Sequence, residues 1–580
     1  MTAVGIVGEH TLIYAQGREF GEVGTYTMSR LTLQHSVDPF HPSNQTIVDL
    51  DLASADADGQ VIFEQDIIVL KPTDPSRSNG RVLVDIVNRG RPTSTTYVNR
   101  DDSPPFPLPE EPPPGDGLLF ELGWTVVMAG WQFDIDHHKL LGLRAPKASR
   151  GGQQLRGQVS YSAMPAQPLA TLSLGLPGHR PFAALPGVDA VLTETDASGL
   201  GSGREVSSDD WAFTPDGRGV VRSGGFLPGR NYVVTYSAEG AMVAGCGLLA
   251  LRDLGPWIRQ QIPEASSLVL LGVSQCGRLI RQFLHDGLNV DESGGRVYDA
   301  MLPIIAGGRL GHFNQRFANP GVLPVWDSGV SGAATYADLL VSSDESDTAP
   351  KIIAINSSTE YWRGDAALIH QDREAGTAHE SVRVHHVACT QHSPGVVPQL
   401  FSDPFTGVRG ATGFGTVDYR PVVRAMLLQL VEWVEDEVEP SEDFVPTGSQ
   451  LSSRSEVLGH FAAKGWQIPD EQSFGQPVGP VPAVDDEGRE IGGIRLPDIV
   501  APLGVHTGWN VRDPDCGAPT FQLMLRGSTV WNDDQPELEP HLEHVRVVAE
   551  DLANQRLILG SDVETLVADA RVRWLEATRT

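Results

Sequence analysis

The chain has 580 residues and a formal net charge of −31, from 74 acidic and 43 basic side chains. It is longer than one compact core usually grows, so we expect one large domain with insertions or two domains. The acidic residues are spread along the chain, and no dense block of Lys and Arg is present that could neutralise a phosphate backbone. The excess of acidic over basic side chains predicts a well-solvated surface and argues against a nucleic-acid partner.

The four cysteines are far apart and form no CxxC pair, which indicates reduced thiols rather than a disulfide framework. The first twenty residues contain no basic segment followed by an apolar run, and nothing later has the apolar length of a membrane span. We therefore expect a cytoplasmic protein without a membrane partner. Self-association into a homo-oligomer is left open.

Short strand patterns separated by turn residues occupy the first part of the chain. They lie at residues 25–34, 45–53, 60–70, 81–87 and 123–134. The run from Val82 to Val87 is almost continuously apolar, as in a central parallel strand, and leads into Asn88-Arg89-Gly90-Arg91-Pro92. A proline tract at 103–117 predicts an extended surface loop. Residues 150–235 are rich in Gly, Ser and Pro, and we interpret them as an insertion.

Strand and helix patterns alternate in the second half, which predicts an α/β protein with a mostly parallel central sheet flanked by helices. Helical spacing is found at 247–262, 421–440, 539–558 and 562–580, and strand patterns at 300–309, 351–360 and 382–391. The expected organisation is first strands at 1–150, an inserted lid or cap at 151–235, a core at 236–440 and a C-terminal elaboration at 441–580.

The segment around Ser274 carries the strongest chemical signal. An apolar strand at 268–271 is followed by a tight turn with the pattern GxSxxG, from Gly272 to Gly277, and then by a helix with one apolar face. A strand, sharp turn and helix with serine at the corner are typical of the nucleophile elbow of the α/β-hydrolase fold. We therefore predict this fold, with Ser274 as the nucleophile. Cys276 is interpreted as a packing residue.

A serine nucleophile needs a base and an orienting carboxylate, which follow it in the chain order acid, then histidine, in this fold. Glu360 follows one strand pattern and His392 the next, so we predict these two residues as acid and base. Asp365 in the same loop as Glu360 is the alternative acid. His385 and His386 lie within a strand pattern and are interpreted as packed or surface residues.

The oxyanion of an acyl-transfer intermediate needs N–H donors at the elbow and in the loop after an earlier strand. Gln275, directly after the serine, supplies the first backbone N–H. The loop with Arg89 and Gly90 supplies the second, although its arginines fit surface charges equally well. Arg278, one helical turn beyond Ser274, could reach the substrate oxygen or form an ion pair on the helix surface.

Several stretches of the sequence resemble a bacterial family of large α/β-hydrolase-domain proteins. They are GVSQCGRLIRQFLHDGLNVDE, GGRLGHFNQRFANP, NSSTEYWRGDAALIH, ACTQHSPG and DEGREIGGIRLPDIVAPLGVHTGWNVR. The elbow is also similar to that of glucuronoyl esterases, which use serine, glutamate and histidine with a basic residue four positions after the serine, here Arg278. This chain has Gln275 where those esterases carry arginine.

The resemblance implies hydrolysis of a carboxylic ester or lactone, with a bulky macrolactone such as zearalenone as one candidate and no cofactor or metal needed. An amidase, peptidase or acyltransferase would share the same residues. A non-catalytic binding protein on a hydrolase scaffold is a further alternative. A metallohydrolase is suggested by the pairs His137-His138 and His385-His386 and by several acidic residues, but these lack the spacing of a chelating motif.

Overall fold

The computed structural model describes residues 3–104, 109–197, 203–321, 334–364, 370, 378–470, 473 and 479–579. Within these ranges a ten-stranded sheet has the order β1-β2-β3-β5-β4-β16-β17-β18-β19, with β6 paired to β3. Its strands are β1 (Ala3–Ile13), β2 (Tyr26–Val37), β3 (Val61–Pro72), β4 (Arg81–Ile86), β5 (Thr125–Ala129), β6 (Leu143–Arg144), β16 (Ser267–Val273), β17 (Ala300–Ile304), β18 (Lys351–Ser357) and β19 (Val382–Val387).

The strands from β5 to β19 pair in parallel, whereas β1, β2 and β3 are antiparallel and form one end of the sheet. The predicted α/β class with a mostly parallel sheet is therefore confirmed. Because parallel strands end at the same edge, the loops that follow β4, β5, β16, β18 and β19 meet there. Those loops carry the residues predicted for the site.

Both faces of the parallel strands are buried, since alternate side chains of one strand belong to two different cores. In β16, Leu268 and Leu270 face one core, and Val269 and Leu271 face the other. The first core is covered by α3 (Cys246–Gln261), α4 (Gln275–His285) and α5 (Tyr336–Glu345). The second is covered by α1 (Ser94–Tyr97), α2 (Leu118–Glu121), α8 (Arg420–Glu435), α10 (Pro497–Val500), α11 (Leu538–Asn554) and α12 (Val563–Ala577).

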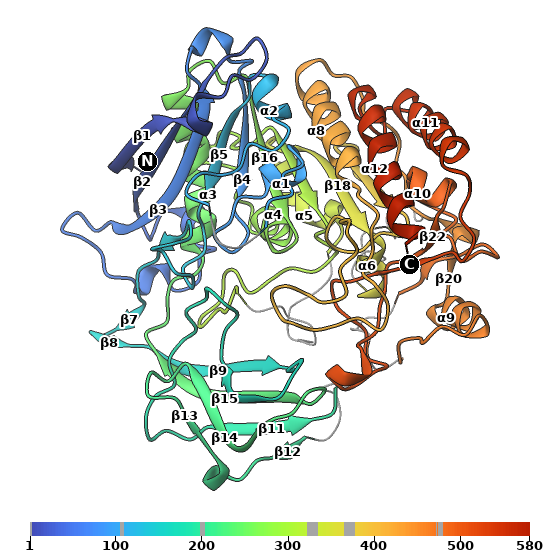
Figure 1. The fold of residues 1–580 in the computed structure, drawn as a ribbon. Helices are drawn as coiled ribbons and strands as arrows, with labels where there is room; N and C mark the ends of the chain where they lie inside the picture. The colour runs from blue at the N-terminus through green and yellow to red at the C-terminus, as the bar shows by residue number, and fades with distance from the viewer. Residues whose placement is uncertain are drawn as a thin grey trace.

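A separate two-layer β unit, which we call the β-sandwich, lies between β6 and α3 in the chain and below the sheet in Figure 1. One layer has the order β12-β11-β15-β9 and the other β10-β14-β13. Apolar side chains of both layers, among them Tyr236 and Val220, share one core. The strands are β9 (Arg156–Ala163), β10 (Leu169–Ser173), β11 (Val191–Thr195), β12 (Arg204–Glu205), β13 (Trp211–Phe213), β14 (Gly219–Phe226) and β15 (Asn231–Glu239).

The chain enters and leaves the β-sandwich at adjacent points. The Ala148 N–H donates to the Ala241 carbonyl at 2.8 Å, and the Val243 N–H donates to the Pro146 carbonyl at 2.9 Å. A small hairpin follows the entry point, formed by β7 (Ser149–Arg150) and β8 (Gln153–Gln154). The loop at 176–180 then returns to the sheet, where the Arg180 N–H donates to the Asp134 carbonyl at 2.7 Å. The β-sandwich thus contributes residues to the edge where the parallel strands end.

The C-terminal part adds short elements beside β18 and β19 (Figure 1). They are α6 (Ser358–Trp362), α9 (Arg454–Ala463) and the pairs β20 (Leu451–Ser452) with β21 (Val481–Pro482) and β22 (Gly504–Thr507) with β23 (Ser528–Trp531). Bridges join His385 to Phe444 and Val387 to Ile494. This part therefore contacts the strand that leads to the predicted base.

The strand predicted at 45–53 is wrong. Ile47 and Leu50 are buried as expected, but the Leu50 N–H donates to the Ile47 carbonyl in a turn. Asp49 between them has a φ of 63°, a left-handed conformation that no β-strand accommodates. The alternation of apolar residues therefore reflects a loop that anchors itself in the core.

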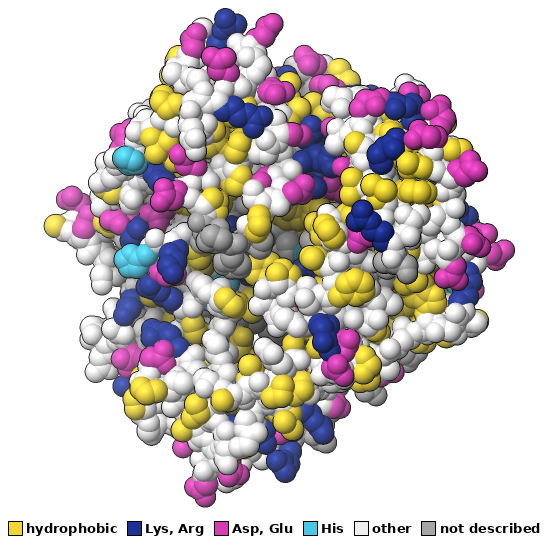
Figure 2. Space-filling model, in the orientation of Figure 1, with side chains coloured by type: hydrophobic (Ala, Val, Ile, Leu, Met, Phe, Trp, Pro, Cys, Tyr) yellow, Lys and Arg dark blue, Asp and Glu magenta, His cyan; other side chains and the backbone are white. Residues whose placement is uncertain are grey.

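The four cysteines are buried and free. On the face shown in Figure 2, Asp and Glu side chains are spread over the surface rather than gathered in one patch. In the part of the chain that the structure describes, no helix combines the length and the apolar character needed to cross a bilayer.

Candidate active site

Ser274 lies at a strained corner between β16 and α4. Its φ of 57° and ψ of −109° lie in a region that L-residues rarely adopt, and its side chain is partly exposed while its neighbours are buried. Strand and helix approach each other closely here: a Cβ at Gly272 would lie 2.5 Å from the Cys276 carbonyl oxygen, and one at Gly277 would lie 2.8 Å from the Ala306 Cβ. The two glycines of GxSxxG are therefore required by this close approach.

The structure brings Ser274, His392 and Glu360 into one hydrogen-bonded line. The Ser274 Oγ lies 2.7 Å from the His392 Nε2, and the His392 Nδ1 lies 2.5 Å from the Glu360 Oε1. Glu360 is fully buried and His392 is 6% exposed. A buried carboxylate that accepts from Nδ1–H leaves Nε2 free to accept the serine proton.

Glu360 is held in place from its other side. It lies in α6, where the Ser357 N–H and Oγ donate to its Oε2 at 2.8 and 2.6 Å and form a capping box. This leaves the Oε1 for His392. The first turn of a short helix after β18 thus fixes the direction in which the carboxylate points.

The electrostatics of the pair favour an ionised acid and a neutral base. Burial opposes the charge on Glu360, but the charge and hydrogen bond of His392 outweigh it, so the pKa of Glu360 lies below its ordinary value. Burial lowers the pKa of His392, and Arg363 and Arg278 act in the same direction, against Glu360. At neutral pH His392 can therefore accept a proton.

The residues predicted as oxyanion donors lie at the start of α4 and in the turn after β4. Arg89 and Gly90 have φ values of 50° and 77° and form the centre of a tight turn, in which the Asn88 and Arg91 backbones bond to each other. The Asn88 Nδ2 donates to the Val273 carbonyl at 2.9 Å, which ties this turn to the elbow. The N–H groups of Gln275, Arg89 and Gly90 make no hydrogen bond to any residue within the described ranges.

The side chains of Gln275 and Arg278 are both buried. The Gln275 Nε2 donates to the Pro320 carbonyl, and its Oε1 has no hydrogen-bond partner. Arg278 is 5% exposed and lies within electrostatic range of His392. The Gln275 side chain is thus bound to the backbone at Pro320, and its backbone N–H remains the predicted donor.

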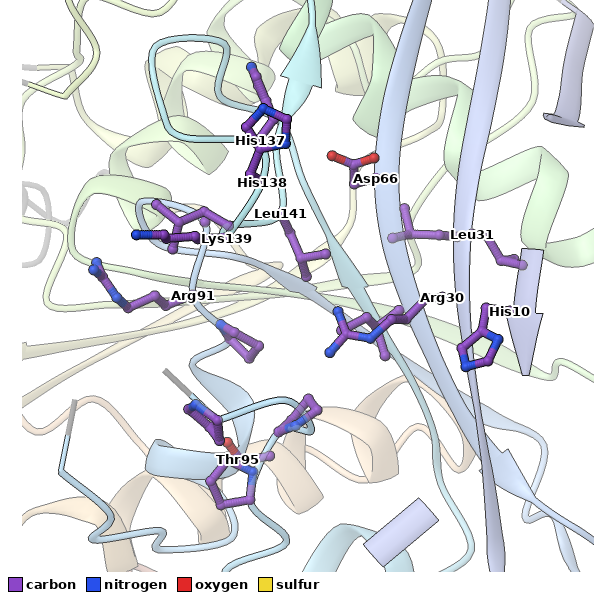
Figure 3. Close-up of a pocket in the computed structure, with 18 of the residues that line it drawn as sticks. His10, Arg30, Leu31, Asp66, Arg91, Thr95, His137, His138, Lys139 and Leu141 are labelled. Atoms are coloured by element: carbon purple, nitrogen blue, oxygen red, sulfur yellow. The ribbon is translucent and has the colours of Figure 1, made fainter. Parts of the chain in front are cut away.

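The two arginines of the turn have different surroundings. The Arg89 Nη1 donates to the Asn88 Oδ1 at 3.0 Å, while its Nε and Nη2 are buried without a hydrogen-bond partner. Arg91 instead lines a groove of about 690 Å³ on the outer side of the turn. Figure 3 shows Arg91 and Lys139 on one side of this groove and Arg30 and His10 on the other.

Sequence reasoning missed several residues that support the acid and the base. The Glu490 Oε2 accepts from the Ser358 Oγ at 2.7 Å, from the His386 Nε2 at 2.9 Å and from the Cys389 N–H at 2.8 Å. The Tyr419 hydroxyl donates to the His392 carbonyl at 2.6 Å. Glu490 lies within the family-like stretch DEGREIGGIRL, which was the available signal, whereas nothing in the sequence singles out Tyr419.

The remaining candidates lie elsewhere. Asp365, the alternative acid, falls outside the described residues. His385 and His386 are fully buried in β19, and the Nε2 of His386 bonds to Glu490 rather than to Ser274. Across the described ranges no three side chains of His, Cys, Asp or Glu converge in a way that could hold a metal ion.

Comparison with known proteins identifies the family. A family model described as an alpha/beta hydrolase domain matches residues 249–568, more than half of the chain. The matched region runs from α3 to α12 and contains the elbow, Glu360, His392 and Glu490. No curated protein and no solved structure matches the chain. The strand order, the elbow and this match together show that the chain is a hydrolase belonging to the alpha/beta hydrolase domain family.

Proposed function

We propose that the protein is a serine hydrolase that cleaves a carboxylic ester or lactone through an acyl-enzyme intermediate. The observation that carries the proposal is the hydrogen-bonded line from the Ser274 Oγ through the His392 imidazole to the Glu360 carboxylate. Nucleophile, base and orienting acid in this order are the parts that acyl transfer to serine needs.

In the proposed reaction the His392 Nε2 takes the Ser274 proton as the Oγ attacks the carbonyl carbon. The N–H groups of Gln275 and of the Arg89-Gly90 turn, together with Arg278, stabilise the negative oxygen of the tetrahedral intermediate. The imidazolium then protonates the leaving alkoxide, and the alcohol departs. A water molecule that gives its proton to His392 attacks the acyl-enzyme, and the collapse of the second intermediate releases the acid and Ser274. A lactone would yield one hydroxy acid as the only product.

The experiment measures hydrolysis of short aryl esters, matched amides and bulky lactones, zearalenone among them. Ser274→Ala is expected to lower kcat by about 10⁴-fold or more, because the nucleophile is removed. Ser293→Ala, at an exposed loop position, is the control and should retain activity. A serine-reactive phosphonate should label Ser274, as read by mass spectrometry. Activity retained by Ser274→Ala, or a label on another residue, would contradict the proposal.

A further inference from the structure

Buried polar atoms without hydrogen-bond partners gather beside the elbow. They are the Nε and Nη2 of Arg89, the Oε1 of Gln275, the Oε1 of Gln132 and the Nε2 of His179. Proteins leave few buried polar groups unpaired, because each loses its bonds to water without replacement. A cluster of them at the end of the parallel strands indicates a place where another molecule supplies the partners.

The cluster is assembled from several elements that the fold brings to one edge. Arg89 follows β4, Gln132 and Asp134 follow β5, and Gln275 follows Ser274 at the start of α4. The β-sandwich adds His179, which forms a bridge with Ile135. Pro320 and Gly321 connect these parts, since the Gln275 Nε2 donates to the Pro320 carbonyl and the Gly321 N–H donates to the Asp134 Oδ2.

Arg89 is a cation of this cluster that has no hydrogen-bonded carboxylate within the described ranges. The nearest acid, Asp134, accepts hydrogen bonds from the Gln132 Nε2 at 2.7 Å and from the Gly321 N–H at 3.1 Å. No ion pair joins Arg89 to a carboxylate among the residues that the structure describes. Burial raises the pKa of Asp134 to about 6, against its hydrogen bonds and Arg89, so Asp134 stays mostly ionised at pH 7. Both of its carboxylate oxygens, however, already accept hydrogen bonds from other groups.

His179 and Arg91, two other titratable neighbours of Arg89, supply no negative charge. Burial, together with Arg89 and Arg91, lowers the pKa of His179 to about 4, so its imidazole is neutral at pH 7. Arg91 adds a second positive charge on the same turn. The Nε and Nη2 of Arg89 therefore remain available to bind an anion.

The free atoms of Arg89 specify the shape of that anion. Nη1 is occupied by Asn88, whereas Nε–H and Nη2–H form one edge of the planar guanidinium. Two parallel N–H groups on one edge match the two oxygens of a carboxylate in a bidentate ion pair. Because Arg89 belongs to the turn proposed to hold the oxyanion, such a carboxylate would lie only a few bonds from the scissile carbonyl.

Building on the proposed esterase function, we propose that Arg89 binds a carboxylate of the substrate, so that the preferred substrate is an ester or lactone with a free carboxylate near the scissile carbonyl. A half-ester of a short dicarboxylic acid has this form. This narrows the proposed substrate class from esters in general to anionic esters. Apolar macrolactones are then expected to be poorer substrates than anionic esters.

The test compares 4-nitrophenyl butyrate with mono(4-nitrophenyl) succinate, which differ by a terminal methyl and a terminal carboxylate on acyl chains of equal length. We expect kcat/KM to be about tenfold or more higher for the succinate ester, and this ratio to fall about tenfold in Arg89→Met. Arg89→Lys should restore only part of the ratio, because an ammonium group lacks the planar fork. Arg180→Met is the matched control: Arg180 is a nearby exposed cation paired with Asp136, and its loss should leave the ratio within about twofold.

Binding provides a readout that needs no turnover. In Ser274→Ala, calorimetric titration should show monomethyl succinate binding about tenfold or more tightly than methyl butyrate, and Arg89→Met in that background should remove the difference. Equal kcat/KM for the two aryl esters, unchanged by Arg89→Met, would overturn the carboxylate site while leaving the esterase function intact. Selective binding of monomethyl succinate without hydrolysis of any ester would support the carboxylate site and overturn the esterase function.

Discussion

In the proposed mechanism His392 acts as a base only while its imidazole is neutral, so its pKa should set the acidic limb of the activity profile. Burial lowers this pKa from the ordinary value of 6.5, against the opposing effect of Glu360. Activity should therefore rise with pH as the imidazole loses its proton. We expect the acidic limb of kcat/KM to have its midpoint below pH 6.5 in a pH series.

Glu360→Gln tests the same pair from the other side. Without the carboxylate the pKa of His392 should fall further, and the acidic limb of kcat/KM should move to lower pH. The rate should fall by roughly 10³- to 10⁴-fold, because the imidazole loses the partner that fixes its tautomer. A limb that moves to higher pH in this variant would contradict the electrostatic assignment.

For single residues, the sequence predicted where the candidate site residues lie along the chain but not which atoms surround their side chains. Ser274, Glu360 and His392 each follow a strand pattern, and parallel strands end at one edge, so their meeting could be anticipated from chain order. The free donors of Arg89 could not be anticipated, since they depend on which atoms of distant loops occupy the same space. Only coordinates distinguish this arginine, whose Nε and Nη2 are buried, from the surface arginine that the sequence equally allowed.

Among the elements, the loops after β18 and β19 have a common anchor in Glu490. Its Oε2 binds Ser358, next to the capping box of Glu360, and the N–H of Cys389, three residues before His392. Glu490 touches none of the three residues of the hydrogen-bonded line, so we interpret it as a positioning residue. It holds the relative placement of acid and base.

Glu490→Gln should therefore lower kcat by about tenfold or more while KM changes little, because a small displacement of acid and base slows the chemical step. The measurement is steady-state kinetics beside thermal unfolding. Glu487→Gln is the control, since Glu487 lies nearby with an exposed side chain and pairs with Arg489. A lower unfolding temperature with unchanged kcat would show that Glu490 is merely structural.

The sequence predicted the elements of the large sheet much better than those of the β-sandwich. Buried parallel strands such as β4 and β16 are nearly continuous apolar runs, which stand out in any sequence. The strands of the β-sandwich are partly exposed, and their partners lie far away along the chain, as for β9 and β15. A local pattern carries little information about such pairing. The strand predicted at 45–53 shows the opposite error, because there a strand-like pattern occurs in a loop.

On the scale of the whole molecule, one charged network joins three distant parts of the chain. Asp418, before α8, binds Arg420 at 2.9 Å and Arg100 at 3.2 Å, and Arg100 also binds Asp569 of α12 at 2.6 Å. Asp418 is 2% exposed, so removal of its charge would leave two cations without their main buried partner. This network connects α12 to the loop after α1 and to the start of α8.

Asp418→Asn is expected to lower the free energy of unfolding by about 3 to 5 kcal/mol, as for other buried ion pairs that lose one partner. Burial opposes ionisation of Asp418, but Arg420 and Arg100 outweigh it and lower the pKa of Asp418 to about 2. This stabilisation is therefore fully present above the ordinary pKa of 3.8 and is lost as the pH falls towards 2. Denaturant unfolding at several pH values measures both effects.

Asp102→Asn is the matched control, because Asp102 also binds Arg420 but its side chain is 67% exposed. It should cost about 1 kcal/mol or less. Equal losses for the two variants would show that burial does not decide the strength of this network.

The adjacent entry and exit of the β-sandwich, at residues 146–148 and 241–243, bear on how the protein evolves. A segment whose two ends meet can be lengthened, replaced or removed by recombination without rethreading the sheet. The proposed catalytic residues all lie outside that segment, whereas His179 within it pairs with Ile135 and lies within electrostatic range of Arg89. Exchange of this one segment between relatives would thus change the selection of substrates while the inherited chemistry stays in place.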